Sequence, residues 1–207
     1  MVRQQRAEQT RARLVQVAAE LFDRYGFAGT NISDITAAAG VTKGALYFHF
    51  TAKEELAAAV QETSTALLGE VVSKIAAADR PPVQALIDLS HAVARMLVTE
   101  PAVRASFRFA RECGDRAEPF VDFHHAWWNT VRELLRAASA NGQLTGTSDV
   151  SLPLLALYVG IEALWSSGLS KTDVATLFAD AWRLVLPGLV TAELAGELIV
   201  EGAAPAG

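Results

Sequence analysis

The feature that most limits what this chain can fold into is a pair of short helix signals in residues 30–50, TNISDITAAAGVTKGALYFHF. Asn31 is a favoured N-cap residue, and Asp34 follows three positions later, which is the arrangement of a capping box. Gly40 can take a positive φ and so permits a tight turn, after which Thr42 caps a second short helix. Two short helices joined by so tight a turn predict a helix-turn-helix, whose second helix enters a DNA major groove.

An amphipathic helix precedes this pair, and a long helix follows it. The preceding helix carries one apolar stripe of period 3.6, which comprises Leu14, Val17, Ala18, Leu21, Phe22 and Tyr25. Gly26 ends this helix, because glycine tolerates the left-handed conformation of a helix terminus. The second short helix ends near Phe50, and Lys53 opens the long helix. We therefore predict a helix-turn-helix DNA-binding domain over residues 1–52 and a second domain over residues 53–207.

The rest of the chain predicts helices, and no segment has the alternating pattern of a strand. Apolar residues make up 51% of the sequence, which is enough to bury a sizeable core. The predicted helices are Pro82–Glu100, Ala102–Glu112, Pro119–Asn141, Val150–Ser167, Thr172–Leu186 and a short Ala192–Val200. Loops are expected at Cys113–Pro119 and at the polar link Gly146–Ser148, and Pro187-Gly188 is expected to interrupt the helical pattern. The predicted fold class is all-α.

The apolar stretches and the cysteine content limit where the protein works. The longest apolar stretches, Leu152–Leu157 and Leu184–Leu189, fall far short of the ~20 residues that a membrane span requires. The N-terminal arginines are followed by no apolar run, so they do not form a secretory signal. Cys113 is the only cysteine, which rules out an internal disulfide and fits a reducing cytoplasm. We expect a cytoplasmic, nucleoid-associated protein with no membrane partner.

The charge of the chain is distributed unevenly. Residues 1–53 hold seven Lys and Arg against four Asp and Glu, a net charge of +3, within an overall charge of −5. The remaining residues therefore carry a net charge of −8. A basic head on an acidic body fits binding to DNA, since phosphate contacts need only one positive face. A basic head that is merely solvated remains the alternative reading of the charge alone.

The start of the second short helix has the properties of a phosphate-binding site. Its free N–H groups and its positive dipole end favour anions. These groups belong to Thr42, Lys43, Gly44 and Ala45. Gly44 and Ala45 also lack bulk, so the helix can approach the floor of a groove. Tyr47 and His49 flank its exposed side, where they can reach phosphates or base edges.

The residues around this helix have two further expected roles. Phe48 and Phe50 are predicted to pack in the core rather than to contact DNA. A flexible N-terminal arm is expected either to reach the DNA backbone or minor groove or to be merely solvated. The basic residues of this arm are Arg3, Arg6, Arg11 and Arg13.

The run from Phe22 to Leu56 resembles the signature of the TetR family of transcriptional regulators. The matching residues in order include Gly26, Thr30, Ile32, Ile35, Gly40, Val41, Thr42, Gly44, Leu46, Tyr47, His49, Phe50, Lys53, Glu54 and Leu56. Asn31 departs from the Thr or Ser that is more usual in the family, but asparagine caps a helix equally well. The resemblance places six residues at DNA-contacting positions: Thr42, Lys43, Ala45, Tyr47, His49 and Lys53.

A narrower resemblance connects the chain with the γ-butyrolactone autoregulator receptors of actinomycetes. It rests on the segments RQQRAEQTRARLVQVAAELFDRYGF and GVTKGALYFHFTAKEELA. The resemblance implies a repressor that leaves a palindromic operator when a small apolar signal of the lactone, butenolide or furan type binds. It also implies that the second domain binds the ligand, with Trp127 as a pocket residue.

The remaining pocket candidates are chosen by residue type. Trp128 points about 100° away from Trp127 on a helix, so only one of the two is expected in the pocket. Further candidates are Leu86, Leu89, Phe107 and Tyr158, although helical stripes of this kind usually fill a core. Trp165 and Trp182 are expected in the core or in an interface.

A homodimer is expected, because one recognition helix contacts only a few base pairs. Two copies spaced by ~34 Å would read a near-palindromic operator on double-stranded DNA. The last two large helices are unusually apolar for the surface of a monomer, and we predict that they pair with their mates. The predicted interface residues are Leu152, Leu155, Val159, Trp165, Leu177, Phe178 and Leu184.

Enzymatic and metal-binding readings have little support in the sequence. Asp122, His124 and His125 lack the i, i+4 spacing of a helical zinc pair, and they are predicted to form a hydrophilic face. We find no nucleophile-elbow glycines, phosphate-binding loop or carboxylate pair, and we expect no catalysis, metal or cofactor. Two alternatives stay open for the regulator: it senses other hydrophobic compounds or drugs, or it is an orphan without a ligand. An enzyme on a borrowed fold is the third alternative.

Overall fold

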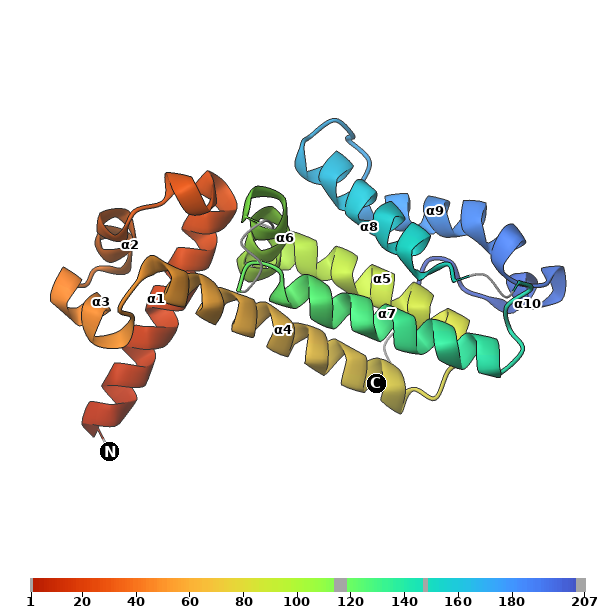
Figure 1. The fold of residues 1–207 in the computed structure, drawn as a ribbon, viewed down its shortest axis with the longest axis horizontal. Helices are drawn as coiled ribbons and strands as arrows, with labels where there is room; N and C mark the ends of the chain where they lie inside the picture. The colour runs from red at the N-terminus through yellow and green to blue at the C-terminus, as the bar shows by residue number, and fades with distance from the viewer. Residues whose placement is uncertain (1, 114–118, 147–148, 204–207) are drawn as a thin grey trace. The chain divides into compact units, whose positions relative to one another are not determined.

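The computed structural model describes residues 2–113, 119–146 and 149–203, in which the regular secondary structure is entirely helical (Figure 1). This confirms the predicted all-α class. The chain divides into two compact units. Unit 1 comprises Met1–Leu67 and Thr99–Ala126, and unit 2 comprises Leu68–Val98 and Trp127–Gly207. Within the described residues, no helix has the combination of length and hydropathy that crossing a membrane would require.

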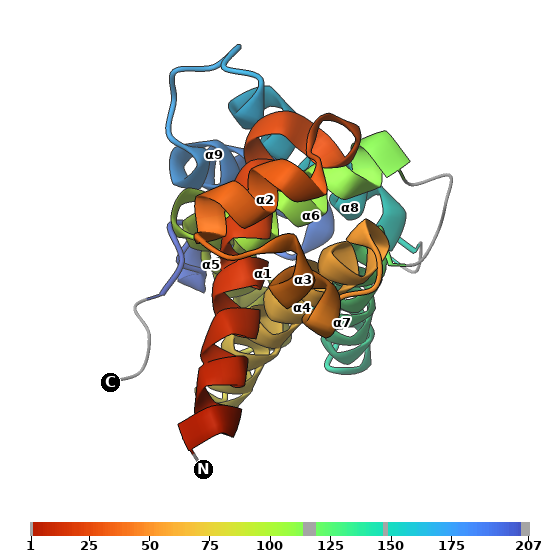
Figure 2. The ribbon, with the colours of Figure 1, turned by 90° about the vertical axis from the view of Figure 1, so that its left-hand side faces the viewer.

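Unit 1 contains the predicted helix-turn-helix. Its elements are α1 (Val2–Gly29), α2 (Ile32–Ala39), α3 (Lys43–His49), the first part of α4 (Lys53–Ala77), α6 (Pro101–Cys113) and the first residues of α7 (Asp122–Ala140). Figures 1 and 2 show α2 and α3 beside α1, and α1 also packs against α6. The core is aromatic at its centre, where Phe22 and Phe109 meet edge to face with ring centroids 5.2 Å apart.

The local signals of the helix-turn-helix are confirmed. Asn31 caps α2 through a capping box with Asp34, in which each side chain bonds the backbone of the other residue. Gly40 follows α2 with a φ of 70°, the left-handed conformation that glycine adopts without steric cost. Gly26 kinks α1 with a φ of 76°, and one further helical turn follows it. The sequence therefore located the caps and the turn, but Gly26, which was predicted to end the first helix, instead marks a kink in α1 three residues before its end.

Unit 2 is a bundle of longer helices. It holds the second part of α4, then α5 (Pro82–Thr99), most of α7, α8 (Ser151–Ser166), α9 (Val174–Leu189) and α10 (Ala192–Glu197). The helices α8 and α9 run side by side as a pair (Figure 1). The Trp182 indole Nε1 on α9 donates to Ser90 Oγ on α5 at 2.8 Å, and both side chains are buried.

Several predicted helix boundaries differ from the structure by one to three residues. Pro187 does not interrupt α9, which continues through it to Leu189. The helix predicted from Pro119 begins at Asp122, and the last short helix ends at Glu197 rather than Val200. Parts of two predicted loops, residues 114–118 and 147–148, lie outside the described residues.

The predicted division at residue 52 is functional, whereas the compact units are defined by packing. Since α4 continues from unit 1 into unit 2, packing alone does not mark where a DNA-binding domain would end. The boundary between residues 1–52 and 53–207 therefore stays a prediction.

Candidate functional site

The short helix α3 is anchored on one side and bare on the other. Leu46 and Phe50 are 0% and 2% exposed and join the core of unit 1. Thr42 caps the helix, since its Oγ1 accepts a hydrogen bond from Ala45 N at 3.1 Å. Lys43 and Gly44 are exposed, and Tyr47 is 52% exposed. The helix thus presents a polar N-terminus and the aromatic ring of Tyr47 outward.

Phe48 contradicts its predicted packing role. Its side chain is 79% exposed and contacts the His49 ring edge to face at 5.0 Å. The physical reason is angular: Phe48 lies about 200° around the helix from Leu46, which faces inward. The sequence contained this signal, because fixing Leu46 in the core places Phe48 on the opposite face. Phe50 is buried as predicted.

Gly44 leaves room on the outer side of α3. A Cβ added there would meet nothing closer than Thr42 Oγ1, at 3.9 Å, which is ordinary van der Waals contact. Packing within the chain therefore does not require glycine at this position. The absence of a side chain remains available for close approach to another molecule.

Lys53 is occupied within unit 1. Its Nζ donates to Phe27 O at 2.8 Å and to Thr30 O at 2.9 Å, and it lies 4.2 Å from the centroid of the Phe27 ring. The side chain therefore ties the start of α4 to the segment that follows the kink in α1. One N–H of the ammonium group remains beyond these two bonds.

The N-terminal arginines lie on a helix rather than on a flexible arm. Helix α1 already begins at Val2, so the expectation of an arm is wrong for the described residues. Arg13 Nε donates to Ala39 O at 2.7 Å at the end of α2, and Arg11 lies 5.2 Å from the Phe50 ring. The side chain of Arg3 lies outside the described residues.

A groove of about 730 Å³ separates the start of α1 from α3. It is lined by Gln4, Arg6, Ala7, Thr10, Ala45, Phe48 and His49. Arg6 supplies positive charge on one wall, and Phe48 and His49 supply aromatic surface on the other. The structure thus gathers Ala45 and His49, both predicted to contact DNA, with an arginine from the first helix.

Unit 2 brings two of the predicted ligand residues together. Trp127 and Tyr158 are 0% and 1% exposed, and their rings stack with centroids 5.5 Å apart and an interplanar angle of 12°. Phe178 and Trp182 meet the Tyr158 ring edge to face at 5.3 and 6.2 Å. We call these four residues the aromatic box.

The Tyr158 hydroxyl is buried in this box without a hydrogen-bond partner. Burial raises its pKa far above the ordinary value, so it is a neutral donor at physiological pH. The nearby Ser90 hydroxyl slightly opposes this shift but makes no well-formed hydrogen bond with Tyr158. Ser90 Oγ instead donates to Ile87 O at 2.6 Å and accepts from Trp182.

The other ligand candidates lie elsewhere. Leu89 lines a separate cavity of about 150 Å³ between α4, α5 and α7, and Leu86 is fully buried on α5. Phe107 belongs to unit 1, where its ring contacts Phe123 at 5.6 Å and His124 at 4.7 Å. The ring stack thus joins Trp127 with Tyr158, whereas Phe107 lies in the other unit.

Four of the exposed apolar side chains of unit 2 are leucines on α8, on α9 and in the turn between them. Leu152 and Leu184, both predicted for an interface, are 61% and 81% exposed. Leu164 and Leu169, which the sequence pattern missed, are 40% and 81% exposed. The prediction that Phe178 lies in the interface is wrong, because Phe178 is fully buried against Tyr158 and is unavailable to a partner.

His124 does not lie on a hydrophilic face. Burial lowers its pKa to about 4, and the positive charge of Arg111 and neighbouring His125 add to the shift. Its imidazole packs edge to face on Phe107, so an apolar environment replaces the predicted polar one. In the described part of the chain, no three His, Cys, Asp or Glu residues gather where they could hold a metal ion.

Comparison with known proteins gives consistent relatives. Residues 14–60 match the profile of bacterial regulatory proteins, tetR family. The A-factor receptor protein of Streptomyces griseus is 30% identical, over 98% of this chain and 71% of its own length. A crystal structure of a gamma-butyrolactone receptor, an ArpA-like protein, has a TM-score of 0.78 at 32% identity and covers 95% of this chain and 98% of that one.

A further solved relative is bound to DNA. It is the TetR family protein CprB from Streptomyces coelicolor in complex with its biological operator sequence, with a TM-score of 0.71 at 30% identity. The match covers 93% of this chain and 94% of that one. The similarity therefore extends over nearly the whole chain rather than over residues 14–60 alone.

Proposed function

Because the chain belongs to the tetR family of bacterial regulatory proteins, we propose that it is a ligand-responsive repressor released from a palindromic operator by a small apolar signal. The signal is of the γ-butyrolactone, butenolide or furan type. The single observation that carries the DNA-binding part is the outward face of α3, where bare backbone and exposed aromatic rings replace the packing expected of a helix in a core.

The residues of α3 divide into two roles. The N-terminal turn, with Thr42, Lys43 and Gly44, binds phosphate through backbone N–H groups and the lysine charge. Ala45 lets the helix approach the groove, while Tyr47 and His49 reach phosphates or base edges. Lys53 retains one N–H for a phosphate while its other contacts orient α4.

Phe48 joins this set on the evidence of its exposure. A solvent-exposed phenylalanine next to a phosphate-binding helix end is suited to apolar contact with a thymine methyl group. Such a contact discriminates between base pairs, whereas the lysine contacts do not. We assign Phe48 to base readout.

Operator binding of this kind needs two copies. The exposed leucines of α8 and α9 supply an apolar surface for pairing with a second chain, since isolated exposed leucines are ordinary but a gathered set is not. Leu152, Leu164 and Leu184 are the proposed contacts. A monomeric mass at micromolar concentration would contradict this part of the proposal.

The ligand site is proposed at the aromatic box. Trp127 offers an apolar ring face, and the Tyr158 hydroxyl offers a buried donor that lacks an acceptor. A lactone or butenolide carbonyl is an acceptor on a small apolar body, so it matches both groups. A ligand shifts the DNA equilibrium only by preferring one conformation, and α4, which contributes to both units, is the proposed lever.

The proposal is tested by a DNA mobility shift with the protein and its own upstream region. The assay is repeated with an organic extract of the producing culture and with a synthetic γ-butyrolactone. Binding that the lactone abolishes supports the whole proposal. If neither addition changes binding, the DNA-binding part of the proposal stands and an orphan regulator is favoured. Release by unrelated drugs instead favours a sensor of hydrophobic compounds.

A further inference from the structure

A stripe of buried polar side chains on α5 forms hydrogen bonds with the segment 198–203 rather than with another helix. Gln84, Asp88 and His91 recur at i, i+4 and i+7, so they share one face of α5. Their residues are only 5%, 7% and 4% exposed. Such groups require partners when buried, and the partners come from the segment 198–203, which follows α10.

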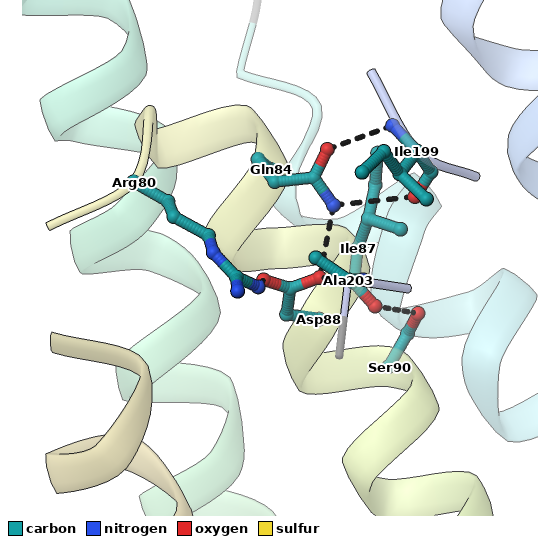
Figure 3. A network of polar contacts seen from close by, with 7 residues as sticks. All are labelled: Arg80, Gln84, Ile87, Asp88, Ser90, Ile199 and Ala203. Carbon is teal, nitrogen blue, oxygen red and sulfur yellow. Dashed lines mark hydrogen bonds and ion pairs between the residues drawn. The ribbon is translucent and has the colours of Figure 1, made fainter. Parts of the chain in front are cut away.

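The contacts read the backbone of this segment (Figure 3). The Gln84 amide pairs with both backbone groups of Ile199: Nε2 donates to the carbonyl at 3.2 Å, and Oε1 accepts from the N–H at 2.8 Å. Asp88 Oδ1 accepts from Ala203 N at 2.8 Å and from Gln84 Nε2 at 2.9 Å, and Arg80 pairs with Oδ2 at 2.8 Å. The three contacts with Ile199 and Ala203 depend on backbone position rather than on side-chain identity.

Three further features complete the docking. His91 Nε2 donates to Val200 O at 2.7 Å. Gly202 has a φ of 77°, and a Cβ added there would lie 2.9 Å from His91 Cδ2, so both conformation and space call for glycine. Glu201 forms an ion pair with Arg183 on α9. The segment thus bridges α5 and α9.

The docked segment also lines a cavity of about 100 Å³. Gly202 and Ala203 form one wall, and Val71, Lys74 and Ile75 from the last turns of α4 form another. The same turns belong to the helix whose first part lies in unit 1. The segment and the end of α4 therefore face the same cavity, and release of the segment would remove one of its walls.

We propose that residues 198–203 are a detachable strap that docks on the backbone-reading stripe of α5 and thereby fixes the last turns of α4. Strap docking is coupled to the position of α4, so it is coupled to operator binding, in both directions. A strap that leaves its site lowers the fraction of molecules in the DNA-competent arrangement. This second consequence rests on the proposed function, whereas the docking itself does not.

The first test uses hydrogen exchange on the wild-type chain across a range of denaturant. The amides of Ile199 and Ala203 are expected to be protected, yet to exchange through an opening that leaves the α5 amides protected. No protection would show that the strap does not dock. Exchange only with global unfolding would show that it is not detachable. Either result overturns the proposal.

The second test compares Gly202→Ala with the matched control Gly196→Ala. Gly196 lies on α10 beside the strap, and a Cβ added there meets nothing within 4 Å. Gly202→Ala is expected to abolish protection at Ile199 and to weaken operator binding roughly fivefold or more, while the control changes neither. Gln84→Met removes the two-point pairing and should reproduce the effect even if Gly202→Ala folds poorly.

The outcomes separate the strap from the proposed function. Lost protection with unchanged operator affinity refutes the coupling to DNA. Lost protection in a chain whose wild type binds no operator refutes the proposed function and leaves the strap intact. Undiminished protection in both Gly202→Ala and Gln84→Met refutes the strap.

Discussion

The outer face of α3 and the aromatic box of unit 2 place their functional side chains in opposite environments. On α3, Tyr47 and Phe48 are 52% and 79% exposed, and the fold does not need their rings. In the box, Trp127 and Tyr158 are 0% and 1% exposed, and any ligand must compete with their packing against each other. Substitutions on α3 should therefore change operator binding without changing stability, whereas substitutions in the box should change both ligand binding and stability.

The largest expected effect is at Trp127. Trp127→Ala removes a fully buried ring, and we expect the free energy of unfolding to fall by ~3–5 kcal/mol. Below its lowered melting temperature, the variant should still bind operator but lose release by the lactone. Denaturant titration and mobility shifts measure the two effects. If the lactone releases the variant from the operator as it releases wild type, Trp127 is not part of the ligand site.

The next effect should appear at Phe48 without any change in stability. Phe48→Ala is expected to weaken operator binding about tenfold or more, and most strongly at one A·T pair, because a lost base contact costs ~1–3 kcal/mol. Its unfolding free energy should stay within ~0.5 kcal/mol of wild type, since the ring is exposed. Binding to a panel of single-base operator variants checks the site. If Phe48→Ala instead lowers the free energy of unfolding strongly, the contrast drawn between the two regions is wrong.

Tyr158→Phe probes the box without emptying it. The hydroxyl lacks a partner, so its removal should leave the free energy of unfolding unchanged or raise it by up to ~1 kcal/mol. The concentration of lactone that releases the operator should rise about fivefold, because the ligand carbonyl loses its donor. Calorimetry and release titrations test the pair of effects. Destabilisation with normal release would assign the hydroxyl a structural role instead.

The smallest effect concerns two glycines in helices. Gly44→Ala and Gly69→Ala should each stabilise the fold by ~0.5–1 kcal/mol, since a Cβ at either position meets no close atom. Only Gly44→Ala should weaken operator binding, because only Gly44 lies on the outer face of α3. Equal operator affinity of the two variants would show that bare backbone at Gly44 is not used.

How far the sequence leads also differs between the two regions. In the helix-turn-helix, Asn31, Gly40 and Thr42 act on their own neighbours, and their roles as caps and turn were predicted residue by residue. Phe48 was misassigned although its angular position was available, because an aromatic residue beside a core position was taken for a core residue. The flexible arm was wrong because no helix-start signal marks the first residues.

The box and the strap lay beyond local reasoning. Trp127 and Tyr158 stand 31 positions apart on different helices, and only packing decided that they stack. Phe178 carries the same apolar signal as Leu184, yet one is buried and the other is 81% exposed. Periodicity identifies an apolar face but does not say whether a neighbour in the same chain covers it.

The sequence by itself determined the helical class, the caps and turns of the DNA-reading region, and the residues at the start of α3, because capping and left-handed glycine act within a few residues. The tertiary structure alone decided which apolar residues meet in the box, why His124 packs against Phe107, and where Gln84 and Asp88 find partners. Those outcomes depend on contacts between distant segments, such as α5 with residues 198–203, whose pairing no local pattern specifies.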